Sequence, residues 1–238
     1  MAETNRFALP LLAAAQAQKH VTVNEALVRL DAVAQMQVRA DDWEVPNAVS
    51  SEGEAHVVGP IASGEWAGQE GKVAVFVNGG WVFLTPQTGW RAWNSILGAE
   101  IVFDGTEWVR YAAVVSGGGA ATLQRVVEID HVIGAEAVSV TSAVIPAKAQ
   151  VIGVTARVTS ALTGTGVSSW SLGVAGAVDR YGSGLGLALN SYAKGLSGAP
   201  VTYWADTALE ITPDAGSFSG GSLRLAVHFT ELVAPRAV

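Results

Sequence analysis

The spacing of apolar residues separates a helical first segment from a β-rich remainder. Between Thr22 and about Arg39, apolar side chains recur every three or four residues, as on one face of a helix. They are Val23, Ala26, Leu27, Leu30, Val33 and Ala34. Thr22 and Glu25 have the spacing of a capping box, so we predict a helix that begins near Val23.

Two interpretations of this helix stay open. It packs against its own domain, or it serves in docking or oligomerisation, because a single helix before an all-β chain has no helical neighbour to cover its apolar face. We therefore treat residues 1–40 as an N-terminal helical docking or oligomerisation segment.

The next segment, residues 41–112, is rich in tryptophan and turn signals. It holds six of the eight tryptophans. Asn78-Gly79 and Asp104-Gly105 each lie between apolar runs, and such pairs favour the positive φ angles that a tight hairpin needs. We predict two hairpins in one small sheet, forming a Trp-rich β domain.

Beyond residue 112 the pattern changes to a sandwich of short strands. Ser116 and the three glycines after it predict a flexible linker over residues 113–122. Eight apolar segments then follow at the spacing of a β-sandwich. They are residues 126–133, 137–145, 151–158, 170–174, 185–190, 201–204, 209–212 and 223–232. The predicted fold is mainly β, with an N-terminal helix, a small Trp-rich β-hairpin domain and a jelly-roll-like β-sandwich over residues 123–238.

Composition supports this fold class and two domains. At 238 residues the chain exceeds the usual single-domain size of roughly 100 to 150 residues. Charged residues make up 15%, below the roughly 25% of ordinary globular proteins. A surface of Ser, Thr, Gly and Ala suits a rigid β protein better than a helical enzyme.

The charge distribution disfavours two classes of partner. The net charge is −7, and there is no basic stripe along the chain. Nucleic-acid binding needs clustered Lys and Arg that release counterions, so DNA and RNA are not expected as ligands. An anionic membrane surface is disfavoured for the same reason.

The chain offers little material for catalysis or cofactor binding. It has no cysteine, which excludes disulfides, thiolate zinc sites and Cys nucleophiles. A Gly-x-Ser-x-Gly nucleophile motif is absent, and the Gly-rich residues 182–186 lack the Lys and the helix of a phosphate-binding loop. The four histidines are scattered, without the spacing of a metal site. We therefore expect no enzyme activity, no cofactor and no metal.

One hydrolytic alternative stays open. Glycoside hydrolysis needs two carboxylates held roughly 5 to 9.5 Å apart, and a sequence does not show such a separation. Asp179, Asp206, Glu210 and Asp214 are possible pairs in the second half, although Asp214 lies in a Pro-Asp-Ala-Gly sequence typical of a turn.

Aromatic residues of the second half predict a glycan site. Trp and Tyr rings stack on the apolar C–H faces of sugars, while nearby polar side chains bind the hydroxyl groups. The candidate ligand-binding residues are Trp170, Asp179, Arg180, Tyr181, Asn190, Tyr192, Tyr203 and Trp204. Core packing is the alternative for each aromatic ring, and Tyr181 is the one that we expect to be most exposed.

Ordered sequence blocks carry a family resemblance over roughly residues 5–111. The first blocks are residues 6–19, 21–27 and 30–31, and the later ones are residues 58–60, 64–68, 79–86, 89–93 and 103–105. In this order they resemble an uncharacterised domain family of tail-fibre and head-spike proteins from phages and from alphaproteobacterial gene transfer agents. The second half is similar, more loosely, to the β-sandwich that follows this domain in some members.

This resemblance implies a role in a virion-type particle. It implies a gene transfer agent head spike, or a tail-fibre protein, that helps attach the particle to capsular polysaccharide on the recipient cell. The expected partners are capsid or other spike and fibre proteins and that polysaccharide. No catalytic residue is established for the family, so none is carried over.

Further expectations concern assembly and location. Spikes are usually cyclic homo-oligomers, so we expect a trimer first and a pentamer next. The N-terminus resembles neither a signal peptide nor a membrane span, so we expect synthesis in the bacterial cytoplasm followed by release in the particle. Two alternative functions remain, a structural adaptor that carries a separate receptor-binding protein and a polysaccharide depolymerase.

Overall fold

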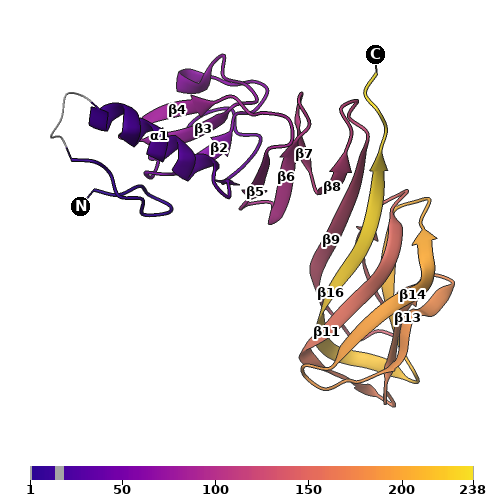
Figure 1. Ribbon diagram of the computed structural model, residues 1–238. Coiled ribbons are helices and arrows are strands. Elements are labelled where there is room, and N and C mark those ends of the chain that lie inside the picture. The colour runs from indigo at the N-terminus through magenta and orange to yellow at the C-terminus, as the bar shows by residue number, and fades with distance from the viewer. Residues whose placement is uncertain (1, 14–18, 238) are drawn as a thin grey trace. The chain divides into compact units, whose positions relative to one another are not determined.

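The computed structural model describes residues 2–13 and 19–237. The chain divides into two compact units, unit 1 with the bounds Met1–Ala121 and Ala234–Val238, and unit 2 with the bounds Thr122–Val233. Residues 14–18, which belong to the first sequence block quoted above, lie outside the described residues. The chain is mainly β, as predicted, and each unit contains more strand than helix (Figure 1).

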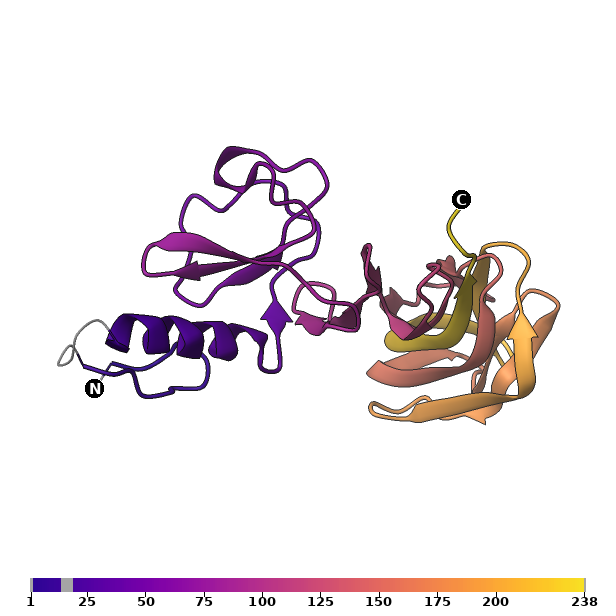
Figure 2. The same cartoon turned by 45° about the horizontal axis from the view of Figure 1, so that its top comes forward.

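Unit 1 combines one helix with two small sheets. Its elements are α1 (Lys19–Val33), β1 (Gln37–Val38), β2 (Ala55–Val57), a 3-10 turn (Gly64–Trp66), β3 (Val73–Val77), β4 (Gly80–Leu84), β5 (Arg91–Asn94), β6 (Ala99–Phe103), β7 (Trp108–Arg110) and β8 (Ala112–Val115). One sheet has the order β2-β3-β4 and the other the order β1-β5-β6-β7. Helix α1 runs alongside the β2-β3-β4 sheet (Figures 1 and 2).

The helix begins and ends earlier than predicted. It starts at Lys19 instead of Val23 and stops at Val33 instead of near Arg39. Gln35 adopts a positive φ of 45°, and the Arg6 guanidinium donates hydrogen bonds to the carbonyl oxygens of Ala32 (3.2 Å) and Gln35 (2.7 Å). These bonds satisfy carbonyl groups that a helix end leaves without partners. The following residues then pair with β5.

The helix packs through a face that overlaps the apolar one in the sequence only in part, because Val33 packs against the core while other residues of that face are exposed. The Asp31 carboxylate accepts hydrogen bonds from Thr4 Oγ1 (2.6 Å) and from the backbone N–H groups of Arg6 (3.0 Å) and Phe7 (2.8 Å). Val23 and Leu30 of the predicted apolar face are 41% and 54% exposed. The helix therefore contacts its own unit, while much of its apolar face lies open to solvent.

Both predicted hairpins form, in two different sheets. Strands β3 and β4 are joined by Asn78 and Gly79, whose φ angles of 52° and 77° are those of a tight two-residue turn. Strands β6 and β7 are joined by a longer turn in which Asp104 Oδ1 accepts from the backbone N–H groups of Thr106 (2.9 Å) and Glu107 (3.0 Å). The expectation of one shared sheet is wrong, because strand β5 continues the chain into a second sheet after β4.

The ends of the predicted sandwich also differ from the sequence interpretation. Residues 113–122, expected to be a flexible linker, form β8, a turn and the start of the next strand. In that turn the Ser116 N–H donates to Ala120 O (2.8 Å) and the Gly119 N–H donates to Ser116 O (3.0 Å). At the C-terminus, the Arg236 side chain forms ion pairs with Asp104 and Glu107, so the last residues belong to unit 1.

Unit 2 is a β-sandwich with the strand order of a jelly roll. Its strands are β9 (Ala121–Val132), β10 (Ser139–Ile145), β11 (Gln150–Thr165), β12 (Trp170–Val174), β13 (Ala177–Leu185), β14 (Tyr192–Thr202), β15 (Thr207–Pro213) and β16 (Ser217–Val233). One sheet has the order β10-β15-β12-β13, and the four unit 2 strands of the other have the order β14-β11-β16-β9. The first strand therefore pairs with the last, the second with the seventh, the third with the sixth and the fourth with the fifth. This nesting confirms the predicted sandwich and its jelly-roll character.

The sequence misplaced two of these strands. Residues 185–190, expected as a strand, form mainly the loop between β13 and β14, and most of both strands was missed. Gly182 and Gly184 have positive φ angles of 145° and 64° inside β13, so the glycines that resembled a loop are irregular strand positions.

Alternation along the long strands fixes the two faces of the β14-β11-β16-β9 sheet. On β16 the side chains of Leu223, Leu225, Val227 and Phe229 are all at most 1% exposed and face the core. The residues between them face outward, as do their neighbours on β9, β11 and β14, which run beside β16 (Figure 1). This outer face carries the candidate site.

Candidate functional site

The tryptophans of unit 1 serve mainly as core. The His56 ring is fully buried and stacks on Trp43, with ring centroids 4.6 Å apart and planes at 23°. The ring centroids of Trp66 and Trp81 lie 5.4 Å and 6.1 Å from that of His56. The two indole rings contact each other edge to face, with centroids 4.9 Å apart. Large rings thus supply the apolar contact that short strands lack.

One hydrogen-bonded histidine–carboxylate pair is built into this aromatic cluster. His56 Nε2 lies 2.8 Å from Glu54 Oε1. Burial lowers the pKa of His56 more than the hydrogen bond with Glu54 raises it, and the nearby Arg39 charge lowers it further. Burial alone raises the pKa of Glu54, but hydrogen bonds from His56, Ser51 and Asn47 bring it below its ordinary value. The imidazole is therefore favoured in its neutral form.

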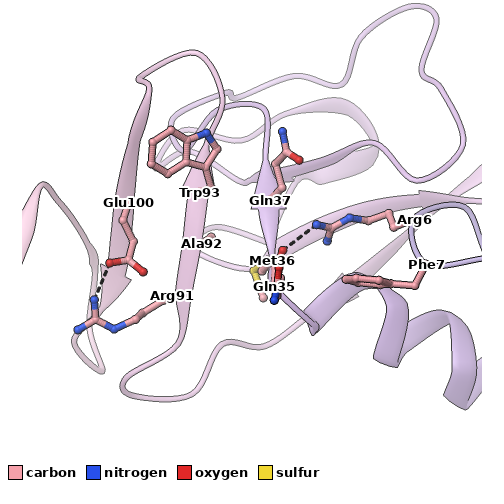
Figure 3. A pocket seen from close by; sticks show the side chains of 9 residues that line it. All are labelled: Arg6, Phe7, Gln35, Met36, Gln37, Arg91, Ala92, Trp93 and Glu100. Carbon is pink, nitrogen blue, oxygen red and sulfur yellow. Dashed lines mark hydrogen bonds and ion pairs between the residues drawn. The ribbon is translucent and has the colours of Figure 1, made fainter.

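Unit 1 also has an open groove beside the half-exposed Trp93. Trp93 and Gln37 come from neighbouring strands, while Arg6 and Phe7 approach from the N-terminal segment (Figure 3). Arg91 is paired with Glu100 at 2.6 Å, and the Arg6 guanidinium is held by the carbonyl oxygens at the end of α1. The groove therefore offers the half-exposed rings of Trp93 and Phe7 and cations that already have partners.

Two of the predicted glycan residues in unit 2 lie in its core. Trp170 and Tyr181 are each 1% exposed. Trp170 Nε1 donates to Gly186 O (3.0 Å), and the Tyr181 hydroxyl shares a hydrogen bond of 2.7 Å with Tyr203. Burial raises the pKa of Tyr181. The expectation that Tyr181 is exposed is wrong, because it alternates inward from β13, and only the core alternative fits these two rings.

The other six predicted residues lie in three separate places. Asp179 and Arg180 are exposed on β13. Asn190 and Tyr192 lie at the start of β14, whereas Tyr203 and Trp204 follow its end. Trp204 is 80% exposed, and the backbone of Tyr203 braces this loop against Lys148 and Ala149. The eight residues therefore do not form a single site.

Two of the carboxylates considered for hydrolysis, Asp206 and Asp214, accept hydrogen bonds from the backbone of loops. Asp206 Oδ1 accepts from the Ala147 N–H (2.8 Å). Asp214 accepts from the Ser168 hydroxyl and from the N–H groups of Ser168 (2.9 Å) and Ser169 (3.0 Å). These hydrogen bonds, that of the hydroxyl first, hold the pKa of Asp214 well below its ordinary value. Asp214 is thus unsuited to donate a proton as a general acid.

The exposed residue Tyr192 lies beside a shallow groove on the outer face of the sandwich. The groove measures about 420 Å³ and lies over β9, β11, β14 and β16. Tyr192 is 60% exposed and pairs in register with Arg157 across the strands. The Arg157 guanidinium lies 5.6 Å from the centre of the Tyr192 ring, and Lys194 Nζ lies 5.9 Å from it. We call Tyr192, Arg157 and Lys194 the Tyr192 cluster.

On the far side of this groove, carboxylates compensate the positive charge of Arg224. Arg224 pairs with Arg157 in the sheet register and binds Asp130 through two hydrogen bonds of 2.8 Å, with Glu128 at 3.5 Å. The hydrogen bond from Arg224 lowers the pKa of Asp130. The groove therefore has a positive side at β14, and at β9 a side where two carboxylates face one guanidinium.

Sequence reasoning identified Tyr192 and Asn190 but missed Arg157, Lys194 and Arg224. The available signal was the two-residue alternation that places Lys194 on the same strand face as Tyr192. Arg157 and Arg224 are separated from Tyr192 by 35 and 32 residues, and only the strand register brings them together.

Two further kinds of site are absent from the described residues. Across residues 2–13 and 19–237, no three His, Asp or Glu side chains are grouped so that they hold a metal ion. Within the same part of the chain, no helix is long and apolar enough to span a bilayer.

Comparison with known proteins finds one family model and a similar solved structure. Residues 23–109 match a family described as a protein of unknown function (DUF2793), which agrees with the expectation of an uncharacterised domain in this region. No curated protein matches the chain. A chain of the Cyanophage Pam1 capsid asymmetric unit is 25% identical over 51% of this chain and 93% of its own, with a TM-score of 0.36. Residues 23–109, which include α1 from Val23 onward and most of unit 1, are thus similar to a family whose function its description leaves open.

Proposed function

We propose that the chain is a non-catalytic spike or fibre subunit of a phage-like particle, such as a gene transfer agent head spike. In this proposal unit 2 attaches the particle to cell-surface capsular polysaccharide. The Tyr192 groove is the observation that carries the attachment role. The particle role is supported by the ordered sequence blocks of residues 5–111, which resemble those of tail-fibre and head-spike proteins.

The shape and chemistry of the groove favour a sugar polymer. Tyr192 offers an exposed ring for the C–H face of a pyranose, and Arg157 and Lys194 supply hydrogen-bond donors beside it. Pockets for small molecules are enclosed and bury most of their ligand. An open groove over four strands is better suited to a polymer that lies along the sheet.

Binding of the full-length chain to a panel of purified capsular polysaccharides tests this proposal. We expect binding to at least one polymer, a loss of about tenfold in Tyr192→Ala, and retention in Tyr192→Phe, because stacking on the ring contributes about 1.4 kcal/mol. Absence of binding by folded protein would contradict the attachment role and favour the structural adaptor. Release of reducing ends would instead favour a depolymerase.

We further propose that the exposed face of α1 joins copies of the chain in a cyclic homo-oligomer, a trimer first and a pentamer next. Val23 and Leu30 are exposed there. Replacing both with glutamate would place like charges opposite each other in such a contact. Light scattering should report an oligomer for the wild type and a smaller species for Val23→Glu with Leu30→Glu. Val49→Glu, at a position 88% exposed outside α1, is the control and should change nothing. A monomeric wild type would contradict this proposal.

A further inference from the structure

The two cations of the Tyr192 cluster differ from the third cation of the groove. Arg224 is held by Asp130 and Glu128. For Arg157 and Lys194, no carboxylate among the described residues lies within ion-pair distance. Both contact the ring of Tyr192 instead. Two like charges beside one ring repel each other, and a bound anion relieves that repulsion.

The Arg157 side chain is held in place by a corner of the chain. Its Nη1 donates to Asn190 O (3.2 Å), and that corner is fixed to β11 by hydrogen bonds from the Asn190 N–H to Val158 O (2.9 Å) and from the Val158 N–H to Ser191 O (2.8 Å). Asn190 has a positive φ of 68°, which Asn tolerates better than most residues. A guanidinium has five N–H donors in a fixed plane, so one bond to Asn190 leaves others for a ligand.

The remainder of the groove suits a sugar ring more than a free anion. Thr155 and Ala226 lie on neighbouring strands between the cations and Glu128, and their small side chains leave room above the sheet. Glu128 and Asp130 are exposed on β9, where carboxylate oxygens accept hydrogen bonds from hydroxyl groups. A ligand with an anionic group near β14 and hydroxyl groups near β9 therefore matches the two sides of the groove.

We infer that the ligand of the Tyr192 groove is an acidic polysaccharide, whose sugar carboxylates bind Arg157 and Lys194 while a pyranose ring packs on Tyr192. This inference rests on the proposed attachment function and adds the chemical class of the polymer. The chain as a whole carries a net charge of −7 and repels polyanions, so recognition depends on these two side chains.

The experiment uses the full-length chain and matched acidic and neutral polymers. The acidic probes are polygalacturonate, alginate and hyaluronate, and the neutral probes are the same polymers after reduction of their carboxyl groups to alcohols. Affinities are measured by calorimetry at two salt concentrations. We expect at least one acidic polymer to bind, its reduced form to bind at least about tenfold more weakly, and added salt to weaken binding of the acidic form.

Charge-removing variants locate the contact. Arg157→Gln and Lys194→Gln should each weaken binding of the acidic polymer by about tenfold or more, since a hydrogen bond between charged groups is about that strong. Lys148→Gln is the matched control, because Lys148 is an exposed cation of unit 2 in the turn before β11. Near-native circular dichroism confirms that each variant is folded.

The outcomes separate this inference from the proposed function. Equal binding of acidic and reduced polymers that depends on Tyr192 would overturn the inference and leave attachment in place. Binding that falls equally in Lys148→Gln would show unspecific charge attraction and also overturn it. Failure of every acidic polymer to bind would overturn the inference, whereas the attachment role itself is contradicted only if the panel of capsular polysaccharides also fails to bind.

Discussion

The two units use aromatic residues in opposite ways. In unit 1, Trp66 and Trp81 pack around the buried ring of His56, in a region whose strands have at most five residues. In unit 2, strands of up to 17 residues bury a core made mainly of aliphatic side chains, and Tyr192 and Trp204 lie on the surface. An aromatic ring is free for recognition only where other side chains already complete the core.

The largest expected effect tests the core role of tryptophan in unit 1. Trp66→Ala removes a fully buried ring and should lower the free energy of unfolding of unit 1 by about 3–5 kcal/mol. Urea denaturation followed by tryptophan fluorescence measures it. Trp93→Ala, at a half-exposed ring, should cost far less. Similar losses in the two variants would break the distinction between core and surface rings.

A smaller effect tests the exception in unit 2, where Trp170 is buried. Trp170→Phe leaves Gly186 O without its donor and should cost about 1–3 kcal/mol of unit 2 stability, with no change in polysaccharide affinity. Thermal unfolding and calorimetry give the two numbers. A large loss of affinity in a stable variant would return Trp170 to the binding site and contradict its assignment to the core.

A hairpin turn provides the next test in unit 1. Gly79→Ala places a side chain at a φ of 77° and should destabilise unit 1 by about 1–2 kcal/mol. Gly80→Ala, one residue later at an ordinary φ with open space around it, is the control and should change stability little. Equal effects of the two substitutions would show that turn geometry does not limit this sheet.

The smallest effect concerns the pH dependence of the aromatic cluster. Because burial lowers the pKa of His56 below its ordinary 6.5, the unfolded chain takes up a proton at a higher pH than the folded one. The free energy of unfolding of unit 1 should therefore fall as pH drops below about 6.5 and level off below the folded-state pKa. Loss of the Glu54 contribution follows at lower pH, because the pKa of that carboxyl is also lowered.

Denaturation at pH 7.5 and 5.5 measures this dependence. His56→Gln should lose most of the difference between the two pH values, while His228→Gln in unit 2 should keep it. A pH dependence that persists in His56→Gln would assign it to another group.

The sequence predicted the parts of the fold that depend on local pattern. Asn78-Gly79 specified its turn, and the alternation of Leu223, Leu225, Val227 and Phe229 specified the inward face of β16. Glycines in β13 and β14 concealed both strands, because local glycine content is the same in a loop and in an irregular strand.

The sequence predicted only part of the candidate site. Tyr192 was identified by residue type, but Tyr181 was identified by the same criterion and is buried. The two tyrosines differ in the face of their strand on which the side chain lies, and this depends on where β13 and β14 begin. Arg157 joins Tyr192 through pairing of β11 with β14, and such register is a property of the folded sheet.

The most direct test of the central claim compares two exposed rings at opposite ends of β14. Calorimetry measures the affinity of the full-length chain, Tyr192→Ala and Trp204→Ala for the same acidic polysaccharide. If recognition lies on the sheet face beside Arg157, Tyr192→Ala should weaken binding by about tenfold and Trp204→Ala should leave it unchanged. Loss of binding in Trp204→Ala with full affinity in Tyr192→Ala would place recognition in the loop after β14 and contradict the account.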